Sequence, residues 1–285
     1  MTTETELWLF TVSVAASALG GMLGMASGIF IVPILTIFCH IDIRSAIGAS
    51  IVSVIACSCS GAAPFLKGRL TNVRLAIVLE IATTAGALSG VLLAGAIPTS
   101  YLFFIFGIIL LLSAHQMLAR RRNPALASTQ PSTGWLASRL DSSYPDRALG
   151  GDVAYRVERL PIGMLLMYCA GLSSALLGIG SGVLKVPAMD SALRLPIKVS
   201  SATSNFMIGV TAAASAGAYF VRGNIVAPIA GPVALGSVVG AMLGARFLMS
   251  ISNDRIRILF VAVLGALAAQ MFLAAFGTGF FRGTT

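Results

Sequence analysis

The residues best suited to chemistry in this chain lie in GIGSGVLKVP, residues 178–187, inside a long apolar segment. Glycine tolerates backbone conformations that interrupt a helix, and the helix that restarts has unpaired N–H groups in its first turn. Those groups, together with the positive end of the helix dipole, bind anions. Lys185 adds a full positive charge there. The pattern predicts an anion-binding site; the alternative is that Lys185 extends along a short helix to the aqueous surface.

A second copy of this stretch lies near the start of the chain. It reads GMASGIFIVP, residues 24–33, and shares two glycines, a serine, a valine and a proline with the later copy, but has Ile31 where the later copy has Lys185. We expect Pro33 and Pro187 in the first turn of a helix that restarts after each break. The substrate-binding residues predicted at the breaks are Ser27, Gly28, Gly180, Ser181, Gly182 and Lys185.

Small polar residues follow each break on the next apolar segment. Ser50 follows the first break, and Ser204 and Asn205 follow the second. Polar groups deep in a membrane usually face the interior of a helix bundle, so these three residues join the predicted binding site. Their alternative role is to connect neighbouring helices by hydrogen bonds.

One carboxylate, that of Glu80, raises a separate possibility, which is proton transfer. Glu80 is the only acidic residue well inside an apolar segment, and it is the candidate for carrying protons during transport. The alternative for Glu80 is a solvated or ion-paired side chain. Asp190 lies at the end of a segment and is expected to be an ordinary interfacial charge.

The elements that position these residues must be membrane helices, because 57% of the 285 residues are hydrophobic, only 10% are charged and the mean hydropathy is +0.92. A helix needs about twenty apolar residues to cross a bilayer. Eight segments approach or exceed that length, at residues 7–39, 46–66, 75–97, 101–119, 161–189, 199–221, 225–249 and 256–281. We expect an all-α polytopic protein of the cell membrane, with lipid around it. A net charge of +9 is typical of membrane proteins, whose cytoplasmic loops are rich in lysine and arginine. It gives no reason to expect nucleic acid as a partner.

The chain divides into two repeats joined by a polar linker. The first repeat covers residues 1–119, the linker residues 120–160, and the second repeat residues 161–285. Duplicated halves with broken helices are typical of secondary transporters. Rows of small residues, such as Gly236, Gly240 and Gly244, are expected to bring helices into close contact.

Charge favours a re-entrant path for the first and fifth segments, each of which enters the membrane and returns on the same side. The linker is then cytoplasmic together with Lys67, Arg194 and Lys198, as basic residues prefer. Each repeat would contain one re-entrant segment and three crossings, so the two repeats would be inverted relative to each other. The alternative is eight plain crossings, with a kink in the first and fifth.

An enzyme is not expected. His40 and His115 are isolated, no group of residues has the spacing of a metal site, and no nucleophile has a partnered base. The four cysteines lie in or beside apolar segments and are interpreted as packing residues. No catalytic residue, metal or cofactor is therefore predicted. A permease for a small anion is the favoured function; an anion channel and a non-transporting assembly partner are the alternatives.

The two glycine-rich motifs, together with SSATSNFMIGVTAAASAGAYFVRGNI at residues 200–225, resemble the sulfite exporter TauE/SafE family of permeases. The likeness covers nearly the whole chain. It implies two repeated halves and the movement of sulfite, sulfoacetate or related organic anions across the cytoplasmic membrane. The first motif has Ala26 and Ser27, and the second Ser181, where the family usually has glycine.

Overall fold

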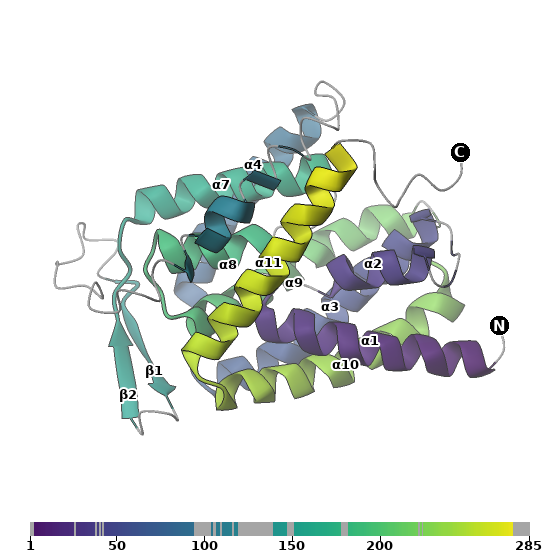
Figure 1. Ribbon diagram of the computed structural model, residues 1–285, viewed down its shortest axis with the longest axis horizontal. Coiled ribbons are helices and arrows are strands. Elements are labelled where there is room, and N and C mark those ends of the chain that lie inside the picture. The colour runs from purple at the N-terminus through teal and green to yellow at the C-terminus, as the bar shows by residue number, and fades with distance from the viewer. Residues whose placement is uncertain are drawn as a thin grey trace. The chain divides into compact units, whose positions relative to one another are not determined.

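The computed structural model describes residues 3–93 except 26, 38, 40 and 42, residues 104, 107, 108, 110–115, 117 and 118, residues 139–146, residues 151–177, and residues 182–275 except 222 and 224. Most of these residues are helical (Figure 1). The elements are α1 Thr3–Leu23, α2 Gly28–Ile37, α3 Ile43–Lys67, α4 Val73–Leu93, β1 Ser142–Asp146, β2 Gly151–Tyr155, α7 Leu160–Leu177, α8 Gly182–Ser191, α9 Ile197–Val221, α10 Ala227–Ser250 and α11 Asn253–Ala275.

Four of the described helices are long and apolar enough to span a bilayer, over Glu4–Leu23, Ser45–Lys67, Val73–Gly90 and Ala227–Ser250. Large apolar side chains such as Ile81, Leu235 and Phe247 remain exposed on these helices. Hydrocarbon is the solvent that such side chains suit, because they would be unfavourable in water. The chain is a multi-pass membrane protein.

A short β-hairpin corrects the expectation of an all-α chain. Strands β1 and β2 pair in a two-stranded sheet within the segment predicted to be a polar linker. The sequences SSYPD and GDVAY have no sustained alternation of apolar and polar residues. The usual period-two signal of a strand is therefore too weak to reveal this hairpin.

The repeat seen in the sequence reappears in the helix boundaries. Helices α8 and α9 begin and end at the positions that correspond, in the repeat alignment, to the ends of α2 and α3. Leu23 and Leu177, the last residues of α1 and α7, also correspond to each other. The first predicted break is confirmed, because α1 ends just before Gly24 and α2 begins at Gly28. In the second repeat, the segment between α7 and α8 lies outside the described residues.

The described structure forms two compact units, and each takes helices from both repeats. The first unit comprises residues 1–76, 143–154 and 198–251, and therefore contains α1, α2, α3, α10 and nearly all of α9. The second unit comprises residues 77–142, 155–197 and 252–285, with most of α4 and with α7, α8 and α11.

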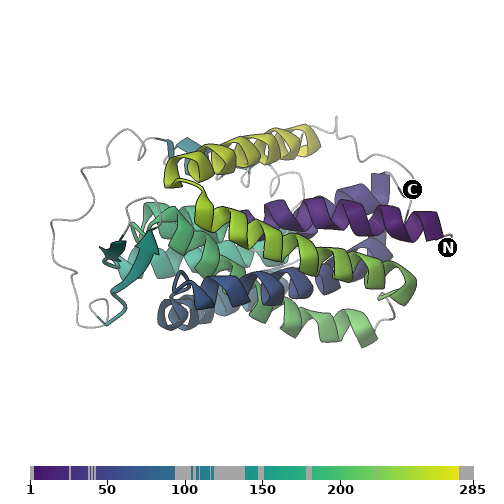
Figure 2. The ribbon, with the colours of Figure 1, turned by 90° about the horizontal axis from the view of Figure 1, so that it is seen from below.

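Close packing of α1 against α10 organises the first unit, and the two helices lie side by side in both ribbon views (Figures 1 and 2). A Cβ atom added at Gly236, Gly240 or Gly244 would overlap the carbonyl group of Phe10, Val14 or Ala18, respectively. The row of small residues predicted from sequence is confirmed as a helix contact. Because both series of residues ascend in steps of four, α1 and α10 run parallel.

Helix α2 folds back along α1. Ile31 and Leu35 of α2 share a buried apolar cluster with Leu9 and Ala16 of α1, and the cluster also includes Ile229 near the start of α10. At a rise of about 1.5 Å per residue, a straight continuation of α1 would carry Leu35 roughly 28 Å beyond Ala16. The first broken segment is therefore a helical hairpin.

The second unit repeats both features. A Cβ atom at Gly86 of α4 would overlap the carbonyl of Tyr168 in α7; in the repeat alignment these two positions correspond to Gly240 and Val14. The end of the α7–α8 segment also returns to its beginning, since the Glu158 N–H donates to the Leu193 carbonyl at 3.2 Å. The second broken segment is likewise a hairpin.

The prolines do not lie where they were expected. Helix α8 begins at Gly182, so Pro187 is inside the helix rather than in its first turn. Pro33 occupies the same position in α2. Proline has no N–H to donate to the carbonyl four residues earlier, and it weakens the helix at this point. The glycines, rather than the prolines, mark where the second helix of each hairpin starts.

Candidate functional site

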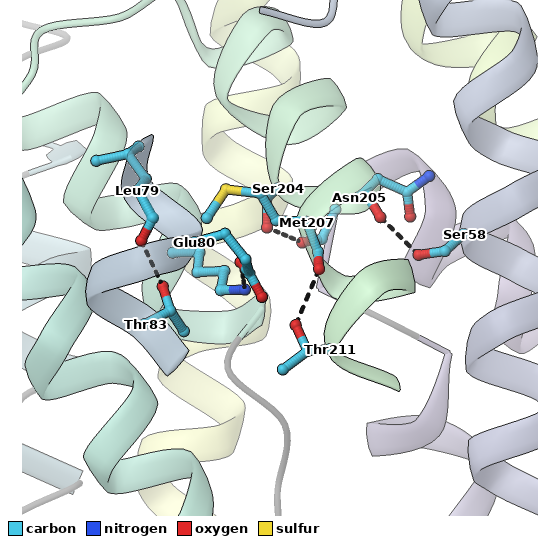
Figure 3. Close-up of polar contacts among 10 residues, drawn as sticks. Ser58, Leu79, Glu80, Thr83, Ser204, Asn205, Met207 and Thr211 are labelled. Carbon is cyan, nitrogen blue, oxygen red and sulfur yellow. Dashed lines mark hydrogen bonds and ion pairs between the residues drawn. The ribbon is translucent and has the colours of Figure 1, made fainter. Parts of the chain in front are cut away.

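Helix α9 contacts the turn between α1 and α2. Gly24 has φ +67°, a conformation that favours glycine, and a Cβ atom there would overlap the carbonyl of Ser201. The Ser204 hydroxyl donates to the Gly24 carbonyl at 2.7 Å. Figure 3 draws this contact beside Asn205. Ser204 thus satisfies a carbonyl that the broken helix leaves without an internal partner.

A chain of three buried hydroxyl groups anchors the start of α2. Ser27 Oγ lies 2.8 Å from Ser53 Oγ, which lies 2.6 Å from Ser237 Oγ. Ser237 donates its single proton to the Val233 carbonyl, so Ser53 must donate to Ser237, and Ser27 to Ser53. The hydroxyl proton of Ser27, expected to face a bound anion, is engaged in this chain.

Several buried polar groups near the first break have no hydrogen-bond partner among the described residues. Both atoms of the Asn205 side-chain amide are buried and have no hydrogen-bond partner among the described residues. The same holds for the hydroxyls of Ser200 and Ser201, one turn earlier on α9. Buried polar groups usually have partners, so these three residues are candidates for contact with a polar ligand. Asn205 was predicted from the sequence, whereas Ser200 and Ser201, five and four residues earlier in SSATSN, were not.

The start of α2 presents free backbone donors. The N–H groups of Phe30 and Ile31 both donate to the Ser27 carbonyl. Those of Gly28 and Ile29 have no acceptor among the described residues. A Cβ atom at Gly28 would lie 2.6 Å from Ser50 Oγ, so only glycine allows α2 and α3 to approach this closely. Gly28 and Ser50 are therefore neighbours, as the sequence prediction required.

A buried positive charge, that of Lys185, lies beside the second break. Residues 178–181, which include the predicted Gly180 and Ser181, lie outside the described residues, and Gly182 is the first residue of α8. Lys185 is fully buried, and its Nζ lies 2.9 Å from Glu80 Oε2 on α4. Figure 3 shows Glu80 with this ion pair. The alternative in which Lys185 reaches the aqueous surface is wrong, and Glu80 is ion-paired.

A second ion pair fixes the other end of α8. Asp190 is fully buried, and its Oδ1 accepts a hydrogen bond of 3.0 Å from Arg257 on α11. The expectation that Asp190 is an ordinary interfacial charge is wrong. Its neighbourhood could not be read from the sequence, because Arg257 is 67 residues away. Beyond the helix end, Arg194 pairs with Glu158 at 3.2 Å.

The polar groups described at the two breaks are suited to binding a polar solute. Within the described part of the chain, no group of three or more histidine, cysteine, aspartate or glutamate side chains is placed to hold a metal ion. Instead, free amides, hydroxyls and one buried ammonium lie at interrupted segments of a multi-pass membrane protein. Interrupted membrane helices of this kind are typical of one class of membrane protein, the transporters.

Comparison with known proteins agrees with that class. Residues 9–271 match the family model described as Sulfite exporter TauE/SafE, and the chain belongs to this family. It is 24% identical over 270 residues to the probable membrane transporter protein YunE of Bacillus subtilis, covering 92% of this chain and 96% of that one. It is 25% identical over 280 residues to the probable membrane transporter protein MJ0441 of Methanocaldococcus jannaschii, covering 93% and 94%. No solved structure matches.

Proposed function

We propose that the protein is a permease of the cell membrane that moves small anions, with sulfite, sulfonates or related organic anions as substrates. The observation that carries this proposal is the fully buried ammonium of Lys185 on a helix that restarts inside a broken membrane segment. A buried cation in a membrane is costly and usually marks the path of an ion or substrate. The membership of the TauE/SafE family supports the same assignment.

The predicted charged and amide groups take distinct roles in this proposal. Lys185 attracts the anion, because it carries a full positive charge in a medium of low dielectric constant. The backbone around Gly28, Gly180 and Gly182 offers amide donors. At the first break, Asn205 offers its unpartnered side-chain amide to a polar solute. These groups recognise a solute and perform no catalysis.

The predicted serines complete the polar surroundings of the two breaks. Ser50 and Ser181 supply hydroxyl groups that can donate to an anion or accept from water. Ser27 and Ser204 also hold the first break in shape, through the hydroxyl chain to Ser53 and through the bond to the Gly24 carbonyl. Ser50 and Ser181 are therefore the hydroxyl donors of this proposal. Ser27 and Ser204 already donate their protons within the protein, so they support the interrupted backbone and leave only their oxygens as acceptors.

The hairpin path of both broken segments supports alternating access. The first hairpin places its interruption in the interior of its unit, where Ser27 is buried. In the second hairpin the two ends lie close together, as the Glu158–Leu193 contact illustrates. Non-helical backbone at membrane depth is tolerated only where protein or water surrounds it. We infer that both segments are re-entrant, that the two repeats are inverted, and that residues 120–160 lie in the cytoplasm. Movement of inverted repeats then exposes the site to each side in turn.

Counterflow in proteoliposomes tests the function. Vesicles containing the purified protein are loaded with unlabelled sulfite, thiosulfate, sulfoacetate or acetate and diluted into the labelled anion. A permease accumulates label transiently against its gradient, because exchange outpaces net exit. A channel gives electrical current without such accumulation, and an assembly partner gives neither. The matched control is the double variant Lys185→Met/Glu80→Leu, which removes both members of the buried pair together and is expected to fold without transporting.

A further inference from the structure

The buried ion pair on α8 and α4 suggests how transport is coupled. Lys185 Nζ and Glu80 Oε2 lie 2.9 Å apart, with the lysine side chain fully buried and the glutamate side chain 14% exposed. In this state the pair is electrically neutral. An anion that approached Lys185 would add a negative charge at a buried site, which is strongly unfavourable unless another charge is removed.

We propose that Glu80 and the transported anion alternate as partners of Lys185, and that Glu80 accepts a proton whenever the anion is bound. This inference rests on the proposed function. The proton comes from water, binds a carboxylate oxygen of Glu80 and removes its charge, which releases the ammonium to the anion. Release of the anion and the proton restores the Glu80–Lys185 pair. The protein then carries one proton with each anion.

Charge balance is the physical reason for this coupling. Counting the described residues, the empty site contains one positive group, Lys185, and one negative group, Glu80. The loaded site contains the ammonium, the anion and a neutral carboxylic acid. Both forms have zero net charge, so both can change conformation within a medium of low dielectric constant. A form that neutralised Glu80 without binding an anion, or bound an anion without a proton, would carry a net charge and could not do so at comparable cost.

Among the described residues, the other charged side chains on α8 and at the ends of its hairpin have ion-pair partners of their own. On α8 itself, Asp190 pairs with Arg257 of α11. Helix α7, which packs against α8, has no charged residue over Leu160–Leu177, and the hydroxyl of its Tyr168 donates to Ser89. At the ends of the hairpin, Arg194 pairs with Glu158. Glu80 is therefore the acid that the structure places in contact with Lys185.

The same charge count specifies the substrate class. One ammonium beside a neutral carboxyl group balances a single negative charge, so the site suits a monovalent anion such as bisulfite or a sulfonate. In the repeat alignment, Lys185 corresponds to Ile31 and Glu80 corresponds to Ala234, each in the opposite repeat. Ile31 and Ala234 are apolar and cannot exchange partners as Lys185 and Glu80 do. One proton therefore moves in each transport cycle.

Methanesulfonate and bisulfite are suitable probes in proteoliposomes. Methanesulfonate stays a monoanion at all pH values used and has no membrane-permeant neutral form, so its pH dependence reports on the protein alone. Wild-type protein is expected to drive net uptake when the external pH is lowered. In Glu80→Gln the empty site keeps the Lys185 charge and loses the carboxylate charge that balances it. Net uptake should fall by about 100-fold or more, because the empty form can no longer return. Exchange of labelled for unlabelled anion needs only the loaded form and should continue in Glu80→Gln.

Glu158→Gln, which breaks the Arg194 pair in the same unit, is the matched control and should leave both net uptake and exchange as in wild type. Glu80→Gln that behaves like wild type, or that loses exchange together with net uptake while remaining folded, overturns the proton coupling and leaves the permease assignment intact. Wild-type protein that transports only divalent anions overturns the monovalent substrate class. Wild-type protein that moves no anion of either charge overturns the proposed function and this inference with it.

Discussion

Substitution of Gly86 by alanine measures how tightly α4 and α7 are packed. A Cβ atom at Gly86 would overlap the Tyr168 carbonyl, which belongs to the backbone and cannot rotate away. Normal contact requires the two helices to separate by roughly 1 Å or more, since unbonded atoms pack at about 3.5 Å. Overpacking of this kind typically costs about 1–3 kcal/mol.

The matched control is Gly265→Ala on α11, where an added Cβ atom meets nothing within 4 Å. Both substitutions gain the same helix propensity, about 1 kcal/mol per glycine replaced. The difference in unfolding free energy between the two variants therefore measures the cost of the Cβ overlap alone. We expect Gly86→Ala to be less stable than Gly265→Ala by about 1–3 kcal/mol.

The assay is unfolding of the purified protein in mixed micelles by increasing mole fractions of dodecyl sulfate, followed by far-ultraviolet circular dichroism. Both alanine variants are compared with wild type under identical conditions. If Gly86→Ala unfolds at the same dodecyl sulfate fraction as Gly265→Ala, the close backbone contact of α4 with α7 does not exist in the membrane protein.

Three further outcomes are expected. Gly240→Ala should lose about 1–3 kcal/mol in the same assay, because its Cβ atom also overlaps a backbone carbonyl; a gain in stability would contradict the repeated packing. Asp190→Asn should lose about 3–5 kcal/mol, as expected for one member of a buried pair, whereas Glu158→Gln should lose less than about 1 kcal/mol; equal losses would refute the difference. Single cysteines in a cysteine-free background should react with impermeant maleimide from the cytoplasmic side at Arg194→Cys and from outside at Glu4→Cys; labelling of Arg194→Cys from outside, as eight plain crossings require, would exclude the re-entrant topology.

The interruption of the broken segments was predictable because its signal is local. Three glycines within the short stretch GIGSG make an uninterrupted apolar helix unfavourable, whatever surrounds it. Repetition of the motif extended the same inference to Gly24 and Gly28, where the structure confirms the break. The row Gly236, Gly240 and Gly244 has the four-residue spacing of one helix face, so its contact with another helix was also predictable.

The ion pairs were not predictable, because they depend on which helix faces meet. Glu80 and Lys185 are 105 residues apart, and the few polar residues of α4 do not gather on one side of the helix. A helix with no polar face gives no indication of which side contacts α8. The same reason explains why Asp190 was misjudged, since its position near a helix end suggested water whereas α11 covers it with Arg257.

The composition of the first compact unit has a consequence for biosynthesis. Helices α1 to α3 are made first, but α9 and α10, which complete their unit, begin only at residues 197 and 227. At about 5–20 residues per second, the ribosome needs on the order of 10 s or more to supply them after α3 leaves it. During that delay the carbonyl of Gly24 lacks its donor from Ser204, and the face of α1 that receives the glycines of α10 has no occupant. The nascent chain must be shielded by the insertion machinery until its last third arrives, and a truncation after the linker leaves both units incomplete.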